Sequence, residues 1–316
     1  METIHPKDID KSDLERMLDL VKARPVDRLT DFPSSADLYE MLGSKESRLH
    51  FQLWETASGR LTGFSILQDY HTWAFLIMEV GSGYQVGEIE GQMIAWGETV
   101  ARQLCKLRNE PIALEVHIRA GDQSRITLLE SAGFELQLGG SVSLARRLSE
   151  PIPAPEIPPD FMIQPSAGEQ EVEEWVRLHR QAWYTENMTV EIRRSMLHTP
   201  FYDPLLDLVA VASDGTLAAY CVCWINQEEN ELTGRKDGHT DPIATHPVYQ
   251  RHGLAKALIL TGLRLLKERG METAQMGTAR DNLGMLRVAE SLGFRIASEA
   301  LWFSKTIVSD LLKKRD

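Results

Sequence analysis

Two hydrophobic periodicities alternate along the chain and predict a mixed α/β protein. In the second half, apolar runs at residues 208–212 and 216–224 flank Ser213-Asp214-Gly215, a typical hairpin turn. Residues 253–269 repeat apolar positions at helical spacing, and Gly270 is expected to end that helix. The predicted elements of this half are, in order, strand 161–164, helices 169–183 and 190–198, strands 208–212, 216–224 and 241–245, helix 253–269, strand 272–277, helix 282–292 and two strands within 295–307.

The first half follows a similar plan, with strands predicted at 49–54, 62–69 and 74–80 and a long helix at 90–107. Two short landmarks recur in the same order. Tyr-Gln occurs at 84–85 and 249–250, and Glu-Ser-x-Gly-Phe occurs at 130–134 and 290–294. Two matched landmarks in one order indicate a duplicated domain.

A proline-rich segment divides the chain almost in half. Residues 149–160 contain five prolines in twelve positions, which excludes a helix or a central strand and favours a stiff, extended linker. The expected domains are therefore residues 1–148 and 161–316.

Composition narrows the function classes. The 316 residues are 43% hydrophobic, so each half can bury a core, and the net charge of −12 argues against nucleic-acid binding. The start of the chain lacks the apolar core of a signal peptide, and no apolar run is long enough for a membrane helix. The three cysteines, Cys105, Cys221 and Cys223, favour a reducing, cytoplasmic setting, and the last two are expected to be small core residues rather than metal ligands.

The turn before helix 253–269 has the features of a phosphate-binding loop. A strand-to-helix turn directs free backbone N–H groups and the positive end of the helix dipole outward. Gly253 and Ala255 would let a pyrophosphate approach closely, and Arg251, His252 and Lys256 would add positive charge.

The residues from Thr245 to Ala255, Thr-His-Pro-Val-Tyr-Gln-Arg-His-Gly-Leu-Ala, resemble the acetyl-CoA signature of the GNAT superfamily of N-acetyltransferases. Asn282 and the run 290–294 resemble the family's second landmark. The resemblance covers residues 161–316 well and 1–148 loosely, and the doubled architecture is similar to that of mycothiol synthase. It implies two tandem GNAT folds, each a mostly antiparallel mixed sheet with a splayed central strand pair flanked by helices.

The resemblance also implies how acetyl-CoA would be held and used. The strand 241–245 would splay from its neighbour, and its backbone would pair with the pantetheine arm and stabilise the oxyanion. Asp241 is the candidate for removing the proton of an amine acceptor, although a plain carboxylate at a strand start is the slightly favoured interpretation. The residues implied in cofactor binding are Ile243, Ala244, Thr245, Gln250, Arg251, His252, Gly253, Leu254, Ala255, Lys256 and Asn282.

One position departs from the family pattern. Ala289 stands where many members carry a tyrosine that protonates the leaving thiolate, and the first half has Leu129 there. A non-catalytic acyl-CoA sensor therefore remains an alternative. Aminoacyl transfer from charged tRNA is a second alternative, which the acidic composition disfavours. The acceptor, a small-molecule or peptide amine, and the oligomeric state stay open.

Several nearby residues have simpler interpretations. His246 and Tyr249 are expected to be structural. Tyr220 and Trp224 share a strand face, so they line an acceptor pocket or pack in the core.

The first half is expected to be catalytically silent. Aligning the two Tyr-Gln pairs sets Glu88 opposite Gly253 and Glu90 opposite Ala255, so carboxylates replace both small residues. A slip of one residue would set Gly87 opposite Gly253 instead. Because like charges repel a pyrophosphate, one CoA per chain is predicted.

Overall fold

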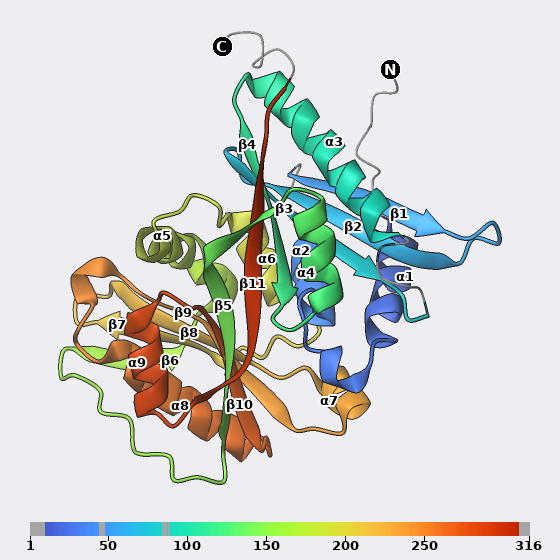
Figure 1. Ribbon diagram of the computed structural model, residues 1–316. Coiled ribbons are helices and arrows are strands. Elements are labelled where there is room, and N and C mark those ends of the chain that lie inside the picture. The colour runs from blue at the N-terminus through green and yellow to red at the C-terminus, as the bar shows by residue number, and fades with distance from the viewer. Residues whose placement is uncertain (1–9, 44–47, 84–86, 88, 310–316) are drawn as a thin grey trace. The chain divides into compact units, whose positions relative to one another are not determined.

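The computed structural model describes residues 10–43, 48–83, 87 and 89–309 (Figure 1). The chain divides into two compact units. Unit 1 contains the residues up to Leu38, Glu46–Gly140 and those from Glu299 onward, and unit 2 contains Tyr39–Lys45 and Ser141–Ser298.

Unit 1 is a sheet with the strand order β1-β2-β3-β4-β11. Its pairs are antiparallel except for β3 with β4. Its elements are α1 (Lys11–Lys22), η1 (Val26–Arg28), the start of α2 (Ser35–Gly43), β1 (Leu49–Glu55), β2 (Leu61–Asp69), β3 (Trp73–Val80), α3 (Glu90–Arg108), β4 (Ile112–Arg119), α4 (Gln123–Ser131) and the end of β11 (Arg295–Ile307).

Unit 2 repeats the plan with the strand order β5-β10-β9-β8-β7-β6, and only β9 and β10 run parallel. Its elements are the end of α2, the end of β5 (Glu135–Arg147), whose start belongs to unit 1, β6 (Phe161–Pro165), η2 (Gly168–Glu171), α5 (Val172–Trp183), α6 (Val190–Leu197), β7 (Asp207–Ala212), β8 (Leu217–Trp224), α7 (Gln227–Thr233), β9 (Asp237–Thr245), η3 (Pro247–Tyr249), α8 (Leu254–Glu268), β10 (Thr273–Ala279), α9 (Leu283–Ser291) and the start of β11. The expected fold class, a mostly antiparallel mixed sheet flanked by helices in each half, is confirmed.

The two halves of the chain exchange their last strands, which corrects the expected domain boundaries. Residues 141–147 of β5 pair with β10 in unit 2, whereas residues 300–307 of β11 pair with β4 in unit 1. The linker 149–160 carries no helix or strand, as predicted, but neither unit coincides with 1–148 or 161–316. Pairing between residues this far apart in sequence leaves no local pattern.

Two further expectations about elements were wrong. The two strands predicted within 295–307 are the single strand β11, because this stretch has no Gly, Pro, Asn or Asp to make a turn. The short helix α7 was not predicted, although Asn226 caps its first turn and Gly234 ends it in a left-handed conformation.

Helices cover both faces of the unit 2 sheet. On one face α8 packs against β7, β8 and β9, and Gly262 allows this close approach because a Cβ there would lie 2.4 Å from the Cys223 sulfur. Cys221 and Cys223 are buried in this core, as expected. On the other face α5 packs against β8 and β9 around Trp175 and Tyr220.

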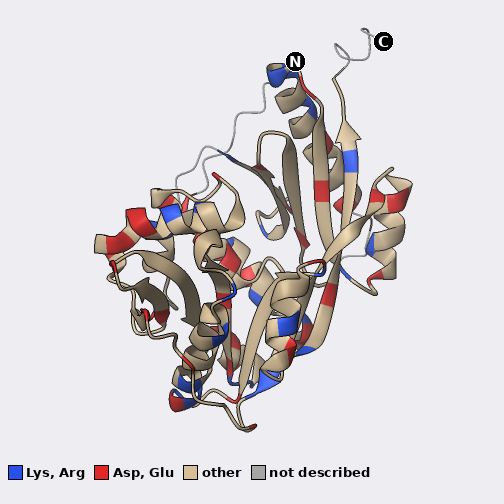
Figure 2. Cartoon of the chain, turned by 90° about the vertical axis from the view of Figure 1, so that its left-hand side faces the viewer, with Lys and Arg blue, Asp and Glu red and all other residues tan. Residues whose placement is uncertain are grey.

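Charged residues are most frequent on the helices and connections, while the strand ribbons in Figure 2 are tan along most of their length. Among the helices that the structure describes, none is long and apolar enough to cross a bilayer.

Candidate functional site

The central strands of unit 2 separate along part of their length. β9 pairs with β10 only from Asp237 to His239, opposite Thr273 to Gln275. From Thr240 onward β9 continues beside β8 alone, while β10 continues beside β5. The β9 edge from 240 to 245 therefore faces a gap in the β9–β10 ladder. The sequence predicted this splay at residues 241–245, on which Ile243, Ala244 and Thr245 lie.

A bulge in β9 marks the start of the gap. Between the pairs Cys221–Ile243 and Cys223–Thr240, β8 has one residue and β9 has two, Asp241 and Pro242. Bulges bend a strand and turn a side chain out of the regular alternation, and they are frequent beside active sites. Here the additional residue introduces a carboxylate at the mouth of the gap.

The Asp241 carboxylate spans the two separating strands. Its Oδ2 accepts a hydrogen bond from the Gly277 N–H of β10 at 3.0 Å. The Asp241 carbonyl accepts one from the Trp224 indole at 3.0 Å, and Trp224 also stacks on His239 with ring centroids 3.7 Å apart. Asp241 is thus held between the two separating strands.

The turn from β9 to α8 is ordered by its own polar side chains. His246 Nδ1 accepts the Val248 N–H, and Gln250 Nε2 donates to the Thr245 carbonyl at 3.4 Å. His252 Nδ1–H donates to the Tyr249 carbonyl at 3.1 Å. The His246 contact and the packing of the Tyr249 ring on Phe161 agree with the structural roles expected for both residues.

The turn ends in two residues of left-handed conformation and an uncapped helix. Arg251 has φ 69° and Gly253 has φ 84°. No side chain caps α8, so the first-turn N–H groups from Leu254 onward lack intrahelical acceptors. A Cβ added to Gly253 would meet nothing within 4 Å, so this approach to the N–H groups is open.

These features fit a pyrophosphate. Several N–H groups at a helix N-terminus form an anion site that the helix dipole reinforces. Leu254 is buried and anchors the helix start, whereas Arg251, His252 and Lys256 are exposed around it. Ala255 is half-buried and packs on the α8 core.

Asn282 is the N-cap of α9. Its Oδ1 accepts the Met285 N–H at 3.1 Å, and the residue is exposed just after β10 ends at Ala279. Capping accounts for one side-chain oxygen and leaves the amide nitrogen available to a ligand in the gap.

Ala289 lies on the buried face of α9 with no exposed surface. Its methyl group cannot protonate a leaving thiolate, as the sequence indicated. Tyr220 of β8 pairs with Ala244 on β9 and is also fully buried.

An aromatic column on α5 holds the Tyr220 hydroxyl. Trp183 Nε1 donates to this hydroxyl at 3.1 Å, and His179 Nδ1 lies 2.7 Å from it. Burial, assisted by the Arg193 charge, lowers the pKa of His179 to about 4, so its ring is neutral where it hydrogen-bonds the Tyr220 hydroxyl. Burial raises the pKa of Tyr220 well above its usual range. Sequence reasoning missed this column, although Trp175, His179 and Trp183 recur every four residues on a predicted helix.

A pocket of about 790 Å³ opens at the far end of α8 from the turn, about 22 Å along the helix. Three aromatic residues, three acidic residues and one arginine are among its lining, and Asp203 pairs with Arg269 at 2.9 Å. Phe201, in its wall, contacts Trp224 with ring centroids 5.4 Å apart. Trp224 thus contacts both Phe201 and the Asp241 carbonyl, so it lies beside this pocket, whereas Tyr220 lies in the core.

The sequence of unit 2 matches a known family. Residues 169–294 match the model of the Acetyltransferase (GNAT) family. The mycothiol acetyltransferase of Segniliparus rotundus is 28% identical over 153 residues, covering 47% of this chain and 57% of that protein. The mycothiol acetyltransferase of Thermobispora bispora is 27% identical over 169 residues, covering 52% and 57%. The match thus spans little more than half the length of these relatives.

Solved structures share the whole fold. A GCN5-related N-acetyltransferase from Sphaerobacter thermophilus superposes with a TM-score of 0.65 at 18% identity, covering 95% of this chain and 94% of that one. A tandem GNAT protein from the clavulanic acid biosynthesis pathway gives 0.66 at 17% identity, covering 95% and 96%. At this level of identity the likeness establishes a tandem GNAT fold.

Proposed function

We propose, from the match of residues 169–294 to the GNAT family and the tandem GNAT fold of the chain, that this protein is an acetyl-CoA-dependent N-acetyltransferase whose active site lies in unit 2. One observation carries the proposal. The unpaired edge of β9 leads directly into the turn whose N–H groups form an anion site. An extended chain bearing a pyrophosphate at one end matches both features.

Each part of the chain has a distinct task in this reaction. When bound, acetyl-CoA supplies an acetyl group activated as a thioester. The turn 250–256 holds the phosphates, Asn282 contacts the arm from the α9 side, and the backbone at Ile243, Ala244 and Thr245 aligns it. A β9 N–H stabilises the negative charge that develops on the carbonyl oxygen.

Asp241 removes the proton of the attacking amine. A free amine has a pKa near ~10 and attacks only when neutral, so a fixed carboxylate at the splay mouth accelerates the reaction. The leaving thiol, with a Cys-like pKa of ~8.5, needs no acid near neutral pH. The Tyr220 hydroxyl is buried and hydrogen-bonded to His179 and Trp183, and the Ala289 methyl group has no proton to give. The site therefore works without a tyrosine acid.

The pocket beside Phe201 suits the body of the acceptor. Its acidic lining, which includes Glu228 and Glu231, favours a cationic small-molecule amine, and its aromatic wall favours an apolar or ring-shaped portion. The mycothiol acetyltransferases named above support a small-molecule acceptor. Glu231→Gln should raise KM for amines and leave kcat unchanged, whereas the exposed Glu174→Gln on α5 should change neither; equal effects would place the acceptor elsewhere.

The decisive experiment compares substitutions at the two glycines that flank α8, Gly253 and Gly270. Gly253→Val puts a branched side chain into the open approach to the N–H groups and should abolish acetyl-CoA binding and transfer to an amine panel. Gly270, at the other end of the helix, also has a left-handed conformation and open space around its Cβ. Gly270→Val thus has the same backbone cost and should keep binding. Equal binding by the two variants would reject the site, and binding without transfer to any amine would favour an acyl-CoA sensor.

A further inference from the structure

Unit 1 retains the splayed strands of an acyl-CoA cleft. β3 pairs with β4 only from Trp73 to Phe75, opposite Ala113 to Glu115. Beyond that point β3 runs on beside β2 to Val80, and β4 runs on beside β11. The backbone therefore has the same gap as unit 2.

The strands of the two units can be matched by their pairing. Glu79 is the penultimate residue of β3 and pairs with Phe64, as Ala244 is the penultimate residue of β9 and pairs with Tyr220. Arg119 ends β4 as Ala279 ends β10.

The helices match in the same way. Asp122 caps α4 as Asn282 caps α9. Gly97 and Gly262 both lie where their helix approaches the sheet, and this register sets Glu90 opposite Ala255.

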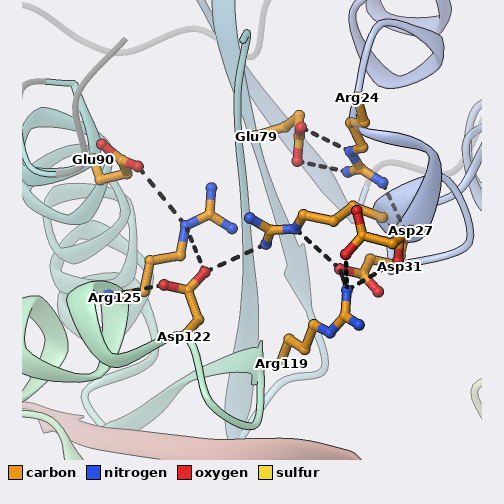
Figure 3. A network of polar contacts seen from close by, with 9 residues as sticks. Arg24, Asp27, Asp31, Glu79, Glu90, Arg119, Asp122 and Arg125 are labelled. Carbon is orange, nitrogen blue, oxygen red and sulfur yellow. Dashed lines mark hydrogen bonds and ion pairs between the residues drawn. The ribbon is translucent and has the colours of Figure 1, made fainter. Parts of the chain in front are cut away.

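Charged side chains join the two walls of the unit 1 gap (Figure 3). On the β3 side, Arg24 Nε and Nη2 bind the Glu79 carboxylate at 2.8 and 2.5 Å. Arg24 also donates to the Asp31 carbonyl at 2.7 Å, and the Asp31 carboxylate lies 3.5 Å from Arg119 at the end of β4. Both Arg24 and Glu79 are at least nine-tenths buried as side chains. The gap is thus bridged from strand to strand.

A second branch reaches the start of α3. Arg28 pairs with Asp31 at 3.2 Å and with Asp122 at 3.3 Å. Arg125 lies 4.0 Å from Asp122 and 3.7 Å from Glu90. The contacts therefore run from α4 to the helix that corresponds to α8.

Glu90 occupies the position of a phosphate. It is 1% exposed, and its Oε2 accepts the Gly87 N–H at 2.9 Å in the turn before α3. A backbone N–H in such a turn is the donor that an anionic ligand would use. Its second oxygen faces Arg125, as a phosphate oxygen would face a guanidinium. Glu88, the other residue predicted to block this turn, lies outside the described residues.

We propose that unit 1 is a self-liganded acyl-CoA cleft, in which the chain's own carboxylates and guanidinium groups fill the place of the cofactor. The network joins Arg24, Arg28, Arg119 and Arg125 to Asp27, Asp31, Glu79, Glu90 and Asp122, so carboxylates outnumber guanidinium groups and no excess positive charge is offered to a pyrophosphate. Unit 1 consequently binds no acyl-CoA, and the chain binds one molecule, in unit 2. The statement that unit 2 binds acyl-CoA rests on the proposed function, whereas the statement that unit 1 is filled by its own side chains does not.

Hydrogen exchange of the full chain with and without acetyl-CoA tests this inference. We expect ligand-induced protection in residues 246–258 and none in 87–94 or 119–125, with one ligand per chain by native mass spectrometry. Protection of 87–94 would overturn the proposal. A lack of protection in 246–258 would instead reject the proposed function and leave unit 1 closed as inferred, so the two failures are distinguishable.

A variant tests the self-ligand directly. Glu90→Ala in the Gly253→Val background releases the Gly87 N–H and Arg125 while the unit 2 site is blocked. Inorganic pyrophosphate should then protect residues 87–94, which it should not do in Gly253→Val alone. Absence of new protection in a variant that keeps the parent's circular dichroism spectrum would show that Glu90 does not hold the ligand's place.

Discussion

The two units share the same splayed backbone, but different kinds of side chain line the gap between the separated strands. Along the gap of unit 2 stand Ala244, Ala279 and Ala255, and the capping residue is Asn282. At the matching places in unit 1 stand Glu79, Arg119, Glu90 and Asp122, all held in ion pairs. Small side chains leave the backbone N–H groups accessible to a ligand. Long, ion-paired side chains fill the gap and accept hydrogen bonds from those N–H groups themselves. On the inference drawn above, a few side chains, and not the splay itself, decide which of the two units can hold a cofactor.

The strand that faces the gap also differs between the units. Between corresponding pairs β9 has Asp241 and Pro242, but β3 has the single apolar residue Ile77. One additional residue in β9 creates the bulge that brings a carboxylate to the strand edge. β3 therefore places no carboxylate at the position that corresponds to Asp241.

The largest effect is expected from removing the central pair of unit 1. Glu79→Ala installs the unit 2 residue but leaves the Arg24 guanidinium buried without its carboxylate. We expect a loss of about 3–5 kcal/mol in the free energy of unfolding by urea denaturation. Arg24→Met combined with Glu79→Ala should recover part of the loss. Acetyl transfer per folded molecule should stay unchanged, and a loss under about 1 kcal/mol would mean that the network does not hold unit 1 together.

Next in size is the base in unit 2. Asp241→Asn removes the basic group but keeps an oxygen that can accept the Gly277 N–H, so kcat/KM should fall by about 100-fold or more with acetyl-CoA binding retained. Asp241→Ala should weaken acetyl-CoA binding as well, because the strands lose their bridge. If Asp241→Asn keeps full kcat/KM on a confirmed acceptor, the role of Asp241 is only to hold the two strands through the Gly277 N–H.

A reciprocal substitution should close the open cleft. Ala255→Glu places the unit 1 carboxylate in the first turn of α8, where the helix dipole favours it and the fold should persist. Acetyl-CoA should bind about 10–100-fold more weakly by calorimetry, which corresponds to about 1.4–2.8 kcal/mol. Ala255→Gln is the neutral control of equal size. A similar loss in both variants would indicate crowding rather than charge.

The smallest effect is a pH dependence of stability. Burial lowers the pKa of His179 to about 4 and that of His239 to about 3, both in unit 2, and it also lowers the pKa of His50 in unit 1. The unfolded chain then binds protons near pH 6.5 that the folded chain does not bind. Stability is therefore fully present above pH 6.5 and falls on acidification below it, by about 1 kcal/mol per unit 2 histidine at pH 5.5. His239→Gln should flatten this dependence in thermal denaturation between pH 7.5 and 5.5, and an unchanged slope would contradict the assignment.

Local patterns in the sequence were sufficient to predict most helices and strands and the turn 250–256. Strand alternation and helix periodicity are properties of neighbouring residues, so β1, β2, β3, α3 and α8 were predicted to within one or two residues. Gly253 before a helix, Asn282 at a cap position and the repeated landmarks are equally local signals. The duplication and the nature of the candidate site could therefore be predicted from the chain alone.

Tertiary structure decided everything that depends on residues distant in sequence. The exchange of β5 and β11 is a choice between two similar sheet edges, and no short pattern distinguishes them. The pair Arg24–Glu79 and the contact of Asp241 with Gly277 join segments that only the folded sheet brings together. Charged residues look solvent-exposed in a sequence, because burial of a charge is favourable only when its partner is already in place. For that reason the sequence predicted repulsion at Glu90, and the folded chain shows a buried carboxylate that accepts the Gly87 N–H and pairs with Arg125.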